Sequence, residues 1–509
     1  MEFQLFFIFS FVILLFLFIV MKKRGKKAQL PPGPWRLPII GNAHQLMHGL
    51  PHQSLRDLAN KYGPLMRLRL GEVSAIVISS PKMAEEVMKT QGLAFVDRPA
   101  PFALEIISYN CSDVAFAPYG AYWRHLRKIC VLELLSTKRV QSFRLMREEE
   151  VSNLIGNISL SISRAGAGFM PVINLSEKVF SLTNDITSRA AFGEKCKDKH
   201  VFLSTMKQVL TFASGFHLAD LFPSIKFLHV ISGAKPKIEK LQREIDSILN
   251  VIIKEHKENK MWANTGESEE DLVDVLLRVQ DASDLDFPIT ADNIKAVILD
   301  IFTAGSDTPA IAVEWAMSEL MRNPREMEKV QTEVRQVFNG KLEVDEAHIH
   351  ELSYLKVVIK ESLRLHPPLP LLLPRECRER CKINGYEIPE KSKVIVNAWA
   401  VGRDPECWKD AESFTPERFV SVDVDYKGTN FELIPFGAGR RICPGISFAV
   451  AIMELLLAQL LYHFDWSLPN GIKPEELDMT EANGSSLRRK NDLYLVPTLY
   501  CNLSVKKDE

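Results

Sequence analysis

The chain has 509 residues, of which 46% are hydrophobic and 25% are charged, and this balance excludes a disordered or fibrous protein. The formal net charge is -1, so no surplus of basic residues points to nucleic acid as a partner. Eight cysteines scattered over so long a chain exclude a disulfide scaffold and predict mostly reduced thiols.

The first predicted element is a membrane-spanning helix over residues 3–21. This segment is almost wholly apolar, and as a helix it would extend roughly 28 Å, about the thickness of a bilayer core. A cleaved signal peptide is the alternative, but it would have a basic leading end and a small-residue cleavage site. Here the basic residues Lys22, Lys23 and Arg24 follow the apolar run, which favours a retained anchor. The positive-inside rule then places the rest of the chain in the cytosol.

A basic and proline-rich segment, residues 22–38, follows the predicted anchor. Proline fixes φ and stops a helix, so Pro31, Pro32 and Pro34 predict a stiff hinge between the membrane and a catalytic body formed by residues 39–509. A plain linker is the alternative, and the two interpretations are compatible.

The fold class predicted for the body is mainly α with small β-sheets. Two apolar runs flank Gly71-Glu72 and predict a β-hairpin over residues 65–78. From about residue 82 to residue 354, apolar residues recur at three and four spacing, which predicts mostly helix. Short β-type runs return over residues 386–396, and helix resumes after Pro444.

Two segments of the helical region are predicted to be irregular. Residues 255–271 are mostly polar and predict a surface loop. Residues 218–231 are unusually apolar for a loop, which leaves two interpretations open: core packing, or a second contact with the membrane beside a substrate entrance.

Two pairs of residues at helical spacing carry groups that suit anions or ion pairs. Trp123 and Arg127 are four apart and share a face, and an indole N–H and a guanidinium both suit a carboxylate. Glu361 and Arg364 are three apart; alone, such a pair is usually a surface bridge worth little. Joined by Arg418, they could form a buried cluster with a structural role.

Asp307 and Thr308 lie in the predicted helical region, after the small residues Ala304 and Gly305. A threonine hydroxyl can relay a proton, and an adjacent acid can supply it. A helix N-cap is the alternative. Pro309 follows; it lacks the N–H that would bond the carbonyl of Gly305 and pushes Thr308 away from α geometry. We therefore expect a kink of more than about 20° between Gly305 and Pro309.

The most specific signal is F-x-x-G-x-R-x-C-x-G, matched at all five fixed places by Phe436, Gly439, Arg441, Cys443 and Gly445. A cysteine thiolate is a strong electron donor to an iron ligated by it. The glycines let the backbone approach a planar group and turn N–H groups toward the sulfur, and an arginine can pair with a carboxylate. A buried structural cysteine is the alternative for Cys443.

This stretch resembles the haem-binding loop of the cytochromes P450, and further matches run along the chain. Residues 304–308 resemble the oxygen-activating motif of that family, and Trp123 to Arg127 resemble its W-R-x-x-R helix. Glu361 to Arg364 look like its E-x-x-R helix, and residues 416–419 like the partner of that helix. The hinge and residues 373–376 are most similar to plant microsomal members that oxidise terpenoids or alkaloids.

The resemblance covers essentially the whole chain and implies haem b as the cofactor, with Cys443 as the iron ligand. It implies that Trp123, Arg127, Arg375 and Arg441 meet the haem propionates; an ordinary surface arginine is the alternative for Arg375. Phe436, Gly439 and Gly445 would complete the haem-binding set. Asp307 and Thr308 would be the catalytic residues of an O2-dependent monooxygenase.

The chain has no credible G-x-G-x-x-G motif, so no flavin or nicotinamide site is predicted. The resemblance implies that NADPH and flavins act only through a membrane-bound NADPH–cytochrome P450 reductase, with cytochrome b5 as a further candidate partner. It places the enzyme in the endoplasmic reticulum membrane as a single-pass protein facing the cytosol. Lys128 and Arg440 could meet an acidic patch on the reductase, or be ordinary solvated charges.

The substrate pocket predicted from the family's variable segments is largely apolar, so a hydrophobic small molecule such as a sesquiterpenoid or diterpenoid is expected, with membrane lipid nearby. Asn483 hints at a hydrogen bond to an oxygenated group, and an alkaloid remains open. A non-oxygenating isomerase or dehydratase and a non-catalytic haem protein are further alternatives; the retained Asp307–Thr308 pair argues against both. The predicted lining residues are Phe102, Ile107, Ile298, Ile301, Phe302, Ala304, Leu369, Leu372 and Ser486.

Overall fold

The structure is a computed structural model of the chain. It describes residues 29–47, 49–165, 170–195, 218–225, 232–262, 270–281, 288–339 and 344–500, with positions 202, 204–206, 208–209, 227 and 228. The predicted anchor over residues 3–21 and residues 22–28 of the predicted hinge lie outside the described residues.

In the part of the chain that the structure describes, the strands form three small sheets. One sheet has the order β1-β2-β7-β4, with β1 and β2 forming the predicted hairpin and β7 parallel to β2. The second has the order β3-β9-β8, and the third pairs β5 with β6. The strands are β1 (Leu65–Leu70), β2 (Val73–Ile78), β3 (Ile173–Asn174), β4 (Arg375–Glu376), β5 (Cys381–Ile383), β6 (Tyr386–Ile388), β7 (Lys393–Val396), β8 (Phe464–Ser467) and β9 (Tyr494–Leu499).

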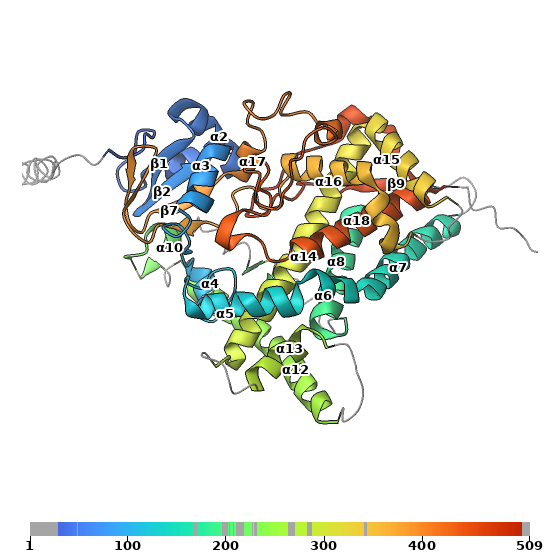
Figure 1. Ribbon diagram of the computed structural model, residues 1–509, viewed down its shortest axis with the longest axis horizontal. Coiled ribbons are helices and arrows are strands. Elements are labelled where there is room, and N and C mark those ends of the chain that lie inside the picture. Colours follow the sequence, from blue (N-terminus) through green and yellow to red (C-terminus); the bar gives the residue numbers. More distant parts are fainter. Residues whose placement is uncertain are drawn as a thin grey trace, which may run out of the picture.

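Helices make up most of the molecule, as the apolar spacing predicts. Figure 1 shows the β1–β2–β7 sheet at one side and the helical body at the other, with α14 passing through the centre. The helices are α2 (Pro51–Tyr62), α3 (Pro81–Glu85), α4 (Phe102–Ile107), α5 (Ala121–Ile129), α6 (Thr137–Ser142), α7 (Arg144–Arg164), α8 (Leu175–Phe192), α10 (Leu218–Leu221), α12 (Ala234–Trp262), α13 (Leu272–Asp281), α14 (Ala291–Arg322), α15 (Pro324–Val337), α16 (Ser353–Leu365), α17 (Ala398–Val401) and α18 (Ile446–His463).

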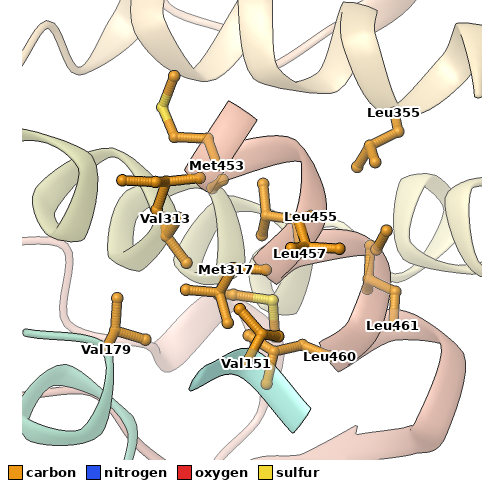
Figure 2. Close-up of a cluster of buried hydrophobic side chains, with 14 of the residues drawn as sticks. Val151, Val179, Val313, Met317, Leu355, Met453, Leu455, Leu457, Leu460 and Leu461 are labelled. Atoms are coloured by element: carbon orange, nitrogen blue, oxygen red, sulfur yellow. The ribbon is translucent and has the colours of Figure 1, made fainter. Parts of the chain in front are cut away.

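The main hydrophobic core lies where α14 and α18 pack together. Val313 and Met317 of α14 and Met453 and Leu457 of α18 are almost fully buried there (Figure 2). Burying one such side chain stabilises the fold by about 1.5–3 kcal/mol. This core forms a rigid support on one side of the segment that follows Cys443, because α18 begins three residues after that cysteine.

One of the two segments predicted to be irregular differs from its prediction. Residues 255–262 belong to the last turns of α12, so the prediction of a loop over residues 255–271 is wrong for that part. The polar residues there sit on a long helix whose other face is apolar, and such a helix tolerates a polar end. In the apolar segment 218–231, Phe222 is buried whereas Phe227 is 61% exposed, so the two aromatic rings have different environments.

The central helix α14 is uninterrupted although it contains Pro309. It begins with a capping box, in which the Thr290 side chain accepts from the backbone N–H of Asn293. The Thr308 hydroxyl donates to the carbonyl of Ala304 at 2.8 Å, one residue before the carbonyl that Pro309 leaves without a helical N–H. A bend of more than about 20° within this continuous helix stays a prediction.

Among the described helices, α14 and α18 are long and apolar enough to cross a membrane, and 67% of the apolar stretch in each is buried inside the molecule. Burial of this extent is what core helices of a folded body show.

Candidate active site

The Cys443 loop joins a short 3-10 helix, Gly439–Arg441, to α18. Gly439 has φ +72°, and a Cβ on it would lie 2.0 Å from the backbone oxygen of Met88, so only glycine fits this close approach. The backbone N–H of Cys443 donates to the carbonyl of Phe436 at 3.0 Å, which closes the loop around the sulfur.

The surroundings of the Cys443 sulfur act on the pKa of its thiol in opposite directions. Burial raises the pKa of the Cys443 thiol, whereas the N–H of Gly445 and the guanidinium of Arg127 act in the opposite direction. The cysteine is free, as are the other five cysteines that the structure describes. An iron ion on the sulfur would supply the remaining stabilisation of the anion, since metal ligation needs the deprotonated form.

Arginines from three separate parts of the chain converge beside this loop. Arg441 donates to the carbonyls of Val96 at 2.9 Å and Ala117 at 2.6 Å. Arg375 of β4 donates to the carbonyl of Ala438 at 3.0 Å, and Arg127 of α5 to that of Ile442 at 2.5 Å. These carbonyls fix the positions of the guanidinium groups without neutralising their charge.

Arg98 is a fourth member of this cluster that the sequence analysis missed, because a single arginine before a proline carries no distinctive pattern. It donates to the carbonyls of Leu373 and Pro374, yet its buried Nε has no hydrogen-bond partner. Burial lowers its pKa well below the ordinary value, and the neighbouring charges of Arg375 and Arg441 act in the same direction. Like charges packed this closely are stable only beside anions.

The arginine cluster therefore fits haem, whose two propionates would supply the missing negative charge and acceptors. Burial lowers the pKa of Arg375 and that of Arg441 to about 10, as expected for guanidinium groups that are buried without a carboxylate bonded to them. The glycine-lined Cys443 loop supplies a flat approach for the ring.

Trp123 supports the arginine cluster. Its Nε1–H donates to the carbonyl of Val114 at 2.9 Å, and the ring lies against the guanidinium of Arg441 at 4.1 Å. Trp123 thus positions Arg441 and the Val114 loop. The predicted contact of its indole N–H with a haem propionate stays a prediction.

The middle of α14 is partly accessible. Ala304 is exposed and Thr308 is half-buried, although this helix is otherwise largely buried. Gly305 lets α8 pack closely, because a Cβ on it would lie 3.0 Å from Cγ2 of Thr187. Asp307 is buried and forms an ion pair with Arg488, which the sequence analysis also missed within a run of three basic residues.

Asp300 of α14 holds the loop that precedes α5. Its Oδ2 accepts from the backbone N–H groups of Val114 at 2.8 Å and Ala115 at 3.0 Å. The carbonyl of Val114 in the same loop accepts from Trp123, so the loop links the central helix to the arginine cluster. Burial raises the pKa of Asp300 well above its ordinary value, with the nearby carboxylate of Asp113 acting in the same direction.

We expect Asp300→Ala to lower the free energy of unfolding by about 1–3 kcal/mol, because two buried N–H groups lose their acceptor. Asp300→Asn keeps one acceptor oxygen and should cost less. Urea unfolding of the haem-loaded protein measures both. Asp292→Ala is the matched control, since this acid lies on the same helix with its side chain 64% exposed. Equal effects of Asp292→Ala and Asp300→Ala would contradict the role given to Asp300.

The structure brings Glu361, Arg364 and Arg418 together. Glu361 and Arg364 are completely buried, with Arg364 Nε 2.7 Å from Glu361 Oε2 and Arg418 Nε 2.9 Å from Glu361 Oε1. Arg364 also donates to the carbonyls of Gly402, Ala411 and Ser413. Every charge in the cluster is therefore paired and hydrogen-bonded, which is the condition under which a buried ion pair persists.

The main cavity has a volume of about 790 Å³ and lies between the β1–β2–β7 sheet and the segment around Leu369. Three predicted pocket residues line it: Leu369, Leu372 and Ser486. A second cavity of about 340 Å³ is lined by Phe302, Asp307 and Glu314, and Arg488 borders both cavities.

The remaining predicted pocket residues have other environments. Ile107, Ile298 and Phe302 are buried in a hydrophobic cluster with α12 and α13, where Phe302 packs between Phe192 and Phe202. Ile301 is half-buried at the edge of that cluster. The backbone N–H of Phe102 donates to Asp220 at 2.9 Å, which joins α4 to α10.

Comparisons with known proteins agree with this geometry. The family model described as Cytochrome P450 matches residues 31–496. Desmethyl-deoxy-podophyllotoxin synthase of Sinopodophyllum hexandrum is 57% identical over 98% of this chain and 98% of its own. Premnaspirodiene oxygenase of Hyoscyamus muticus is 53% identical over 96% of this chain and 97% of its own. A zebra fish cytochrome P450 solved with abiraterone has a TM-score of 0.73 at 22% identity and covers 88% of this chain and 100% of that chain.

The chain therefore belongs to the cytochrome P450 family, and its fold is the mainly helical fold of that family with small sheets. It is a haem-b monooxygenase that receives electrons from a redox partner, as family members do.

Proposed function

We propose that this monooxygenase hydroxylates a sesquiterpenoid or diterpenoid of plant secondary metabolism, with O2 and with electrons from NADPH–cytochrome P450 reductase. The observation that carries the proposal is the cavity of about 790 Å³, whose lining is mostly apolar and includes Leu46, Leu70 and Phe222. Such a volume suits a lipophilic molecule of this size range. The name of the Hyoscyamus muticus relative, premnaspirodiene oxygenase, supports the same substrate class.

In this proposal Cys443 ligates the haem iron, and the arginine cluster of Arg98, Arg127, Arg375 and Arg441 holds the propionates. The bound haem supplies O2 activation, which the thiolate ligand promotes by donating electron density. Phe436, Gly439 and Gly445 shape the sulfur side of the haem.

The proton supply is assigned to Asp307 and Thr308. The Thr308 hydroxyl lies at the open part of α14 and is held by the carbonyl of Ala304, so it is positioned to pass a proton into the space beside it. Asp307 lies on the side of the second cavity, where Glu314 and Arg489 offer a polar route from solvent.

We expect Thr308→Ala to reduce product formation by about 100-fold or more, because a positioned proton donor contributes about 10²–10⁴. Thr308→Ser keeps the hydroxyl and should retain most of the activity. The measurement is product formed per NADPH consumed, with reductase and a terpenoid that the wild type oxidises. If the alanine and serine variants were equally active, the hydroxyl would have no part in proton delivery.

The membrane arrangement is proposed as the sequence predicts it: an anchor over residues 3–21, a hinge over residues 22–38 and a catalytic body over residues 39–509 in the endoplasmic reticulum membrane. Exposed apolar side chains beside the main cavity support membrane contact by the body as well. Ile39 is 81% exposed and Met47 is 73% exposed, and Met47 lines the cavity. Cytochrome b5 remains a proposed second electron donor.

One assay tests the function. Membranes containing the protein, reductase and NADPH are supplied with ¹⁸O2 and a library of terpenes and alkaloids, and the products are read by mass spectrometry. Labelled oxygen in a terpenoid product with NADPH consumption is the expected result. Turnover without NADPH would indicate an isomerase or dehydratase, and labelled alkaloid products alone would favour the alkaloid hydroxylase over the terpenoid one.

A further inference from the structure

Arg488 stands at the partition between the two cavities. It lines the main cavity together with Asn483, Ser485 and Ser486, and it lines the second cavity together with Asp307. Its side chain is 34% exposed although it lies among buried elements, so part of the guanidinium faces open space.

The ion pair with Asp307 fixes the orientation of this guanidinium. One terminal nitrogen, Nη2, donates to Asp307 Oδ1, and the ring of Phe180 lies 5.2 Å from the guanidinium carbon. A guanidinium has five N–H donors in a rigid plane, and the bond to Asp307 uses one of them. The others remain available toward the cavities.

The charged side chains that line the main cavity are basic. Its described lining residues include Lys393 and Arg488 but no aspartate or glutamate. Burial lowers the pKa of Lys393, and the nearby carboxylate of Asp220 acts in the opposite direction. The polar end of the cavity, formed by Asn483, Ser485, Ser486 and Arg488, is therefore rich in hydrogen-bond donors, while the rest of the lining is mostly apolar.

We infer that Arg488 is a specificity-determining residue that selects a lipophile carrying an oxygen acceptor, such as a ketone, hydroxyl or carboxylate, and rejects a protonated amine. This inference rests on the proposed terpenoid function and narrows it to substrates that already carry oxygen. An acceptor oxygen at the polar end would receive a charge-assisted hydrogen bond. An alkaloid cation would meet Arg488 with no lining carboxylate to pair with, and like charges in a desolvated site repel.

The alternative is that Arg488 only neutralises Asp307. Two variants separate these roles. Asp307→Asn removes the acid and leaves the arginine donors in place, so it is the matched control. Arg488→Leu combined with Asp307→Asn removes the donors without leaving a buried unpaired carboxylate, which would by itself destabilise the fold.

The experiment is a spectral titration of the full-length holoenzyme in membranes. The probes are valencene, a sesquiterpene hydrocarbon; nootkatone, the ketone of the same skeleton; and sparteine, an alkaloid base protonated near neutral pH. The reduced carbon monoxide spectrum of each variant serves as the folding control. We expect wild type and Asp307→Asn to bind nootkatone about tenfold more tightly than valencene, as one charge-assisted hydrogen bond allows.

In Arg488→Leu/Asp307→Asn the ratio of nootkatone affinity to valencene affinity should fall to about one, with valencene affinity changed less than about twofold. In the wild type, sparteine should not compete with nootkatone. An unchanged preference in the double variant, or equal affinity for both terpenoids in the wild type, would overturn the role of Arg488 alone. Tight binding of sparteine with no binding of either terpenoid would overturn this role and the proposed terpenoid function together.

Discussion

We expect replacement of Cys443 with serine to abolish the absorption band at about 450 nm of the reduced carbon monoxide complex and to reduce monooxygenase turnover to background. A serine hydroxyl fills nearly the same space but does not ionise near neutral pH, so the strong electron donor to the iron is lost. The loop itself should persist, because Gly439 and the bond from the Cys443 N–H to the Phe436 carbonyl do not depend on the sulfur.

Cys407→Ser is the matched control for this experiment, since Cys407 is a free and exposed cysteine. It should leave both the spectrum and the turnover unchanged. A Cys443→Ser protein that binds haem fully and still shows the band at about 450 nm would contradict the proposed iron ligation by Cys443.

We expect Glu361→Gln to lower the free energy of unfolding by about 3–5 kcal/mol, because the substitution leaves Arg364 buried without its counter-charge. The loss should appear as a lower melting temperature of the holoenzyme and as faster haem loss on heating. Urea unfolding followed by circular dichroism and by haem absorbance measures both.

Glu85→Gln provides the control for the cluster. Glu85 pairs with Lys89 at 2.9 Å, as Glu361 pairs with Arg364, but its side chain is 45% exposed. Exposed pairs contribute little to stability, so this variant should melt close to the wild type. If both glutamate substitutions had similarly small effects, the Glu361 cluster would not be essential to the stability of the holoenzyme.

Several site residues could be predicted from the sequence because their chemistry is encoded in short, contiguous spacing. Cys443 and its glycines occupy one loop, and Glu361 and Arg364 share one turn of a helix. Asp300 could have been suspected, since it lies two helical turns before Asp307 in an otherwise apolar run. Its partners could not, because the loop at Val114 and Ala115 meets α14 only in the folded chain.

The residues that line the pocket were the hardest to predict from the sequence. Ile107 and Ile298 are apolar residues in the expected segments, yet they pack in one cluster with α12, whereas Phe302 belongs to the same cluster and also lines the second cavity. Apolar character predicts burial, and whether the burial is against protein or against a cavity depends on which helices face each other. The sequence likewise could not predict that the indole N–H of Trp123 donates to the carbonyl of Val114.

By itself, the sequence determined the class of enzyme and the largely helical fold, and it predicts Cys443 as the thiolate ligand, because a five-position motif and helical periodicity are local properties of the chain. Only the tertiary structure decided which charges meet. It brought Arg98 to the other three arginines, and it set Arg488 against Asp307 at the partition between two cavities. These residues are far apart in sequence, and electrostatic interaction depends on distance and burial in space, which no spacing along the chain encodes.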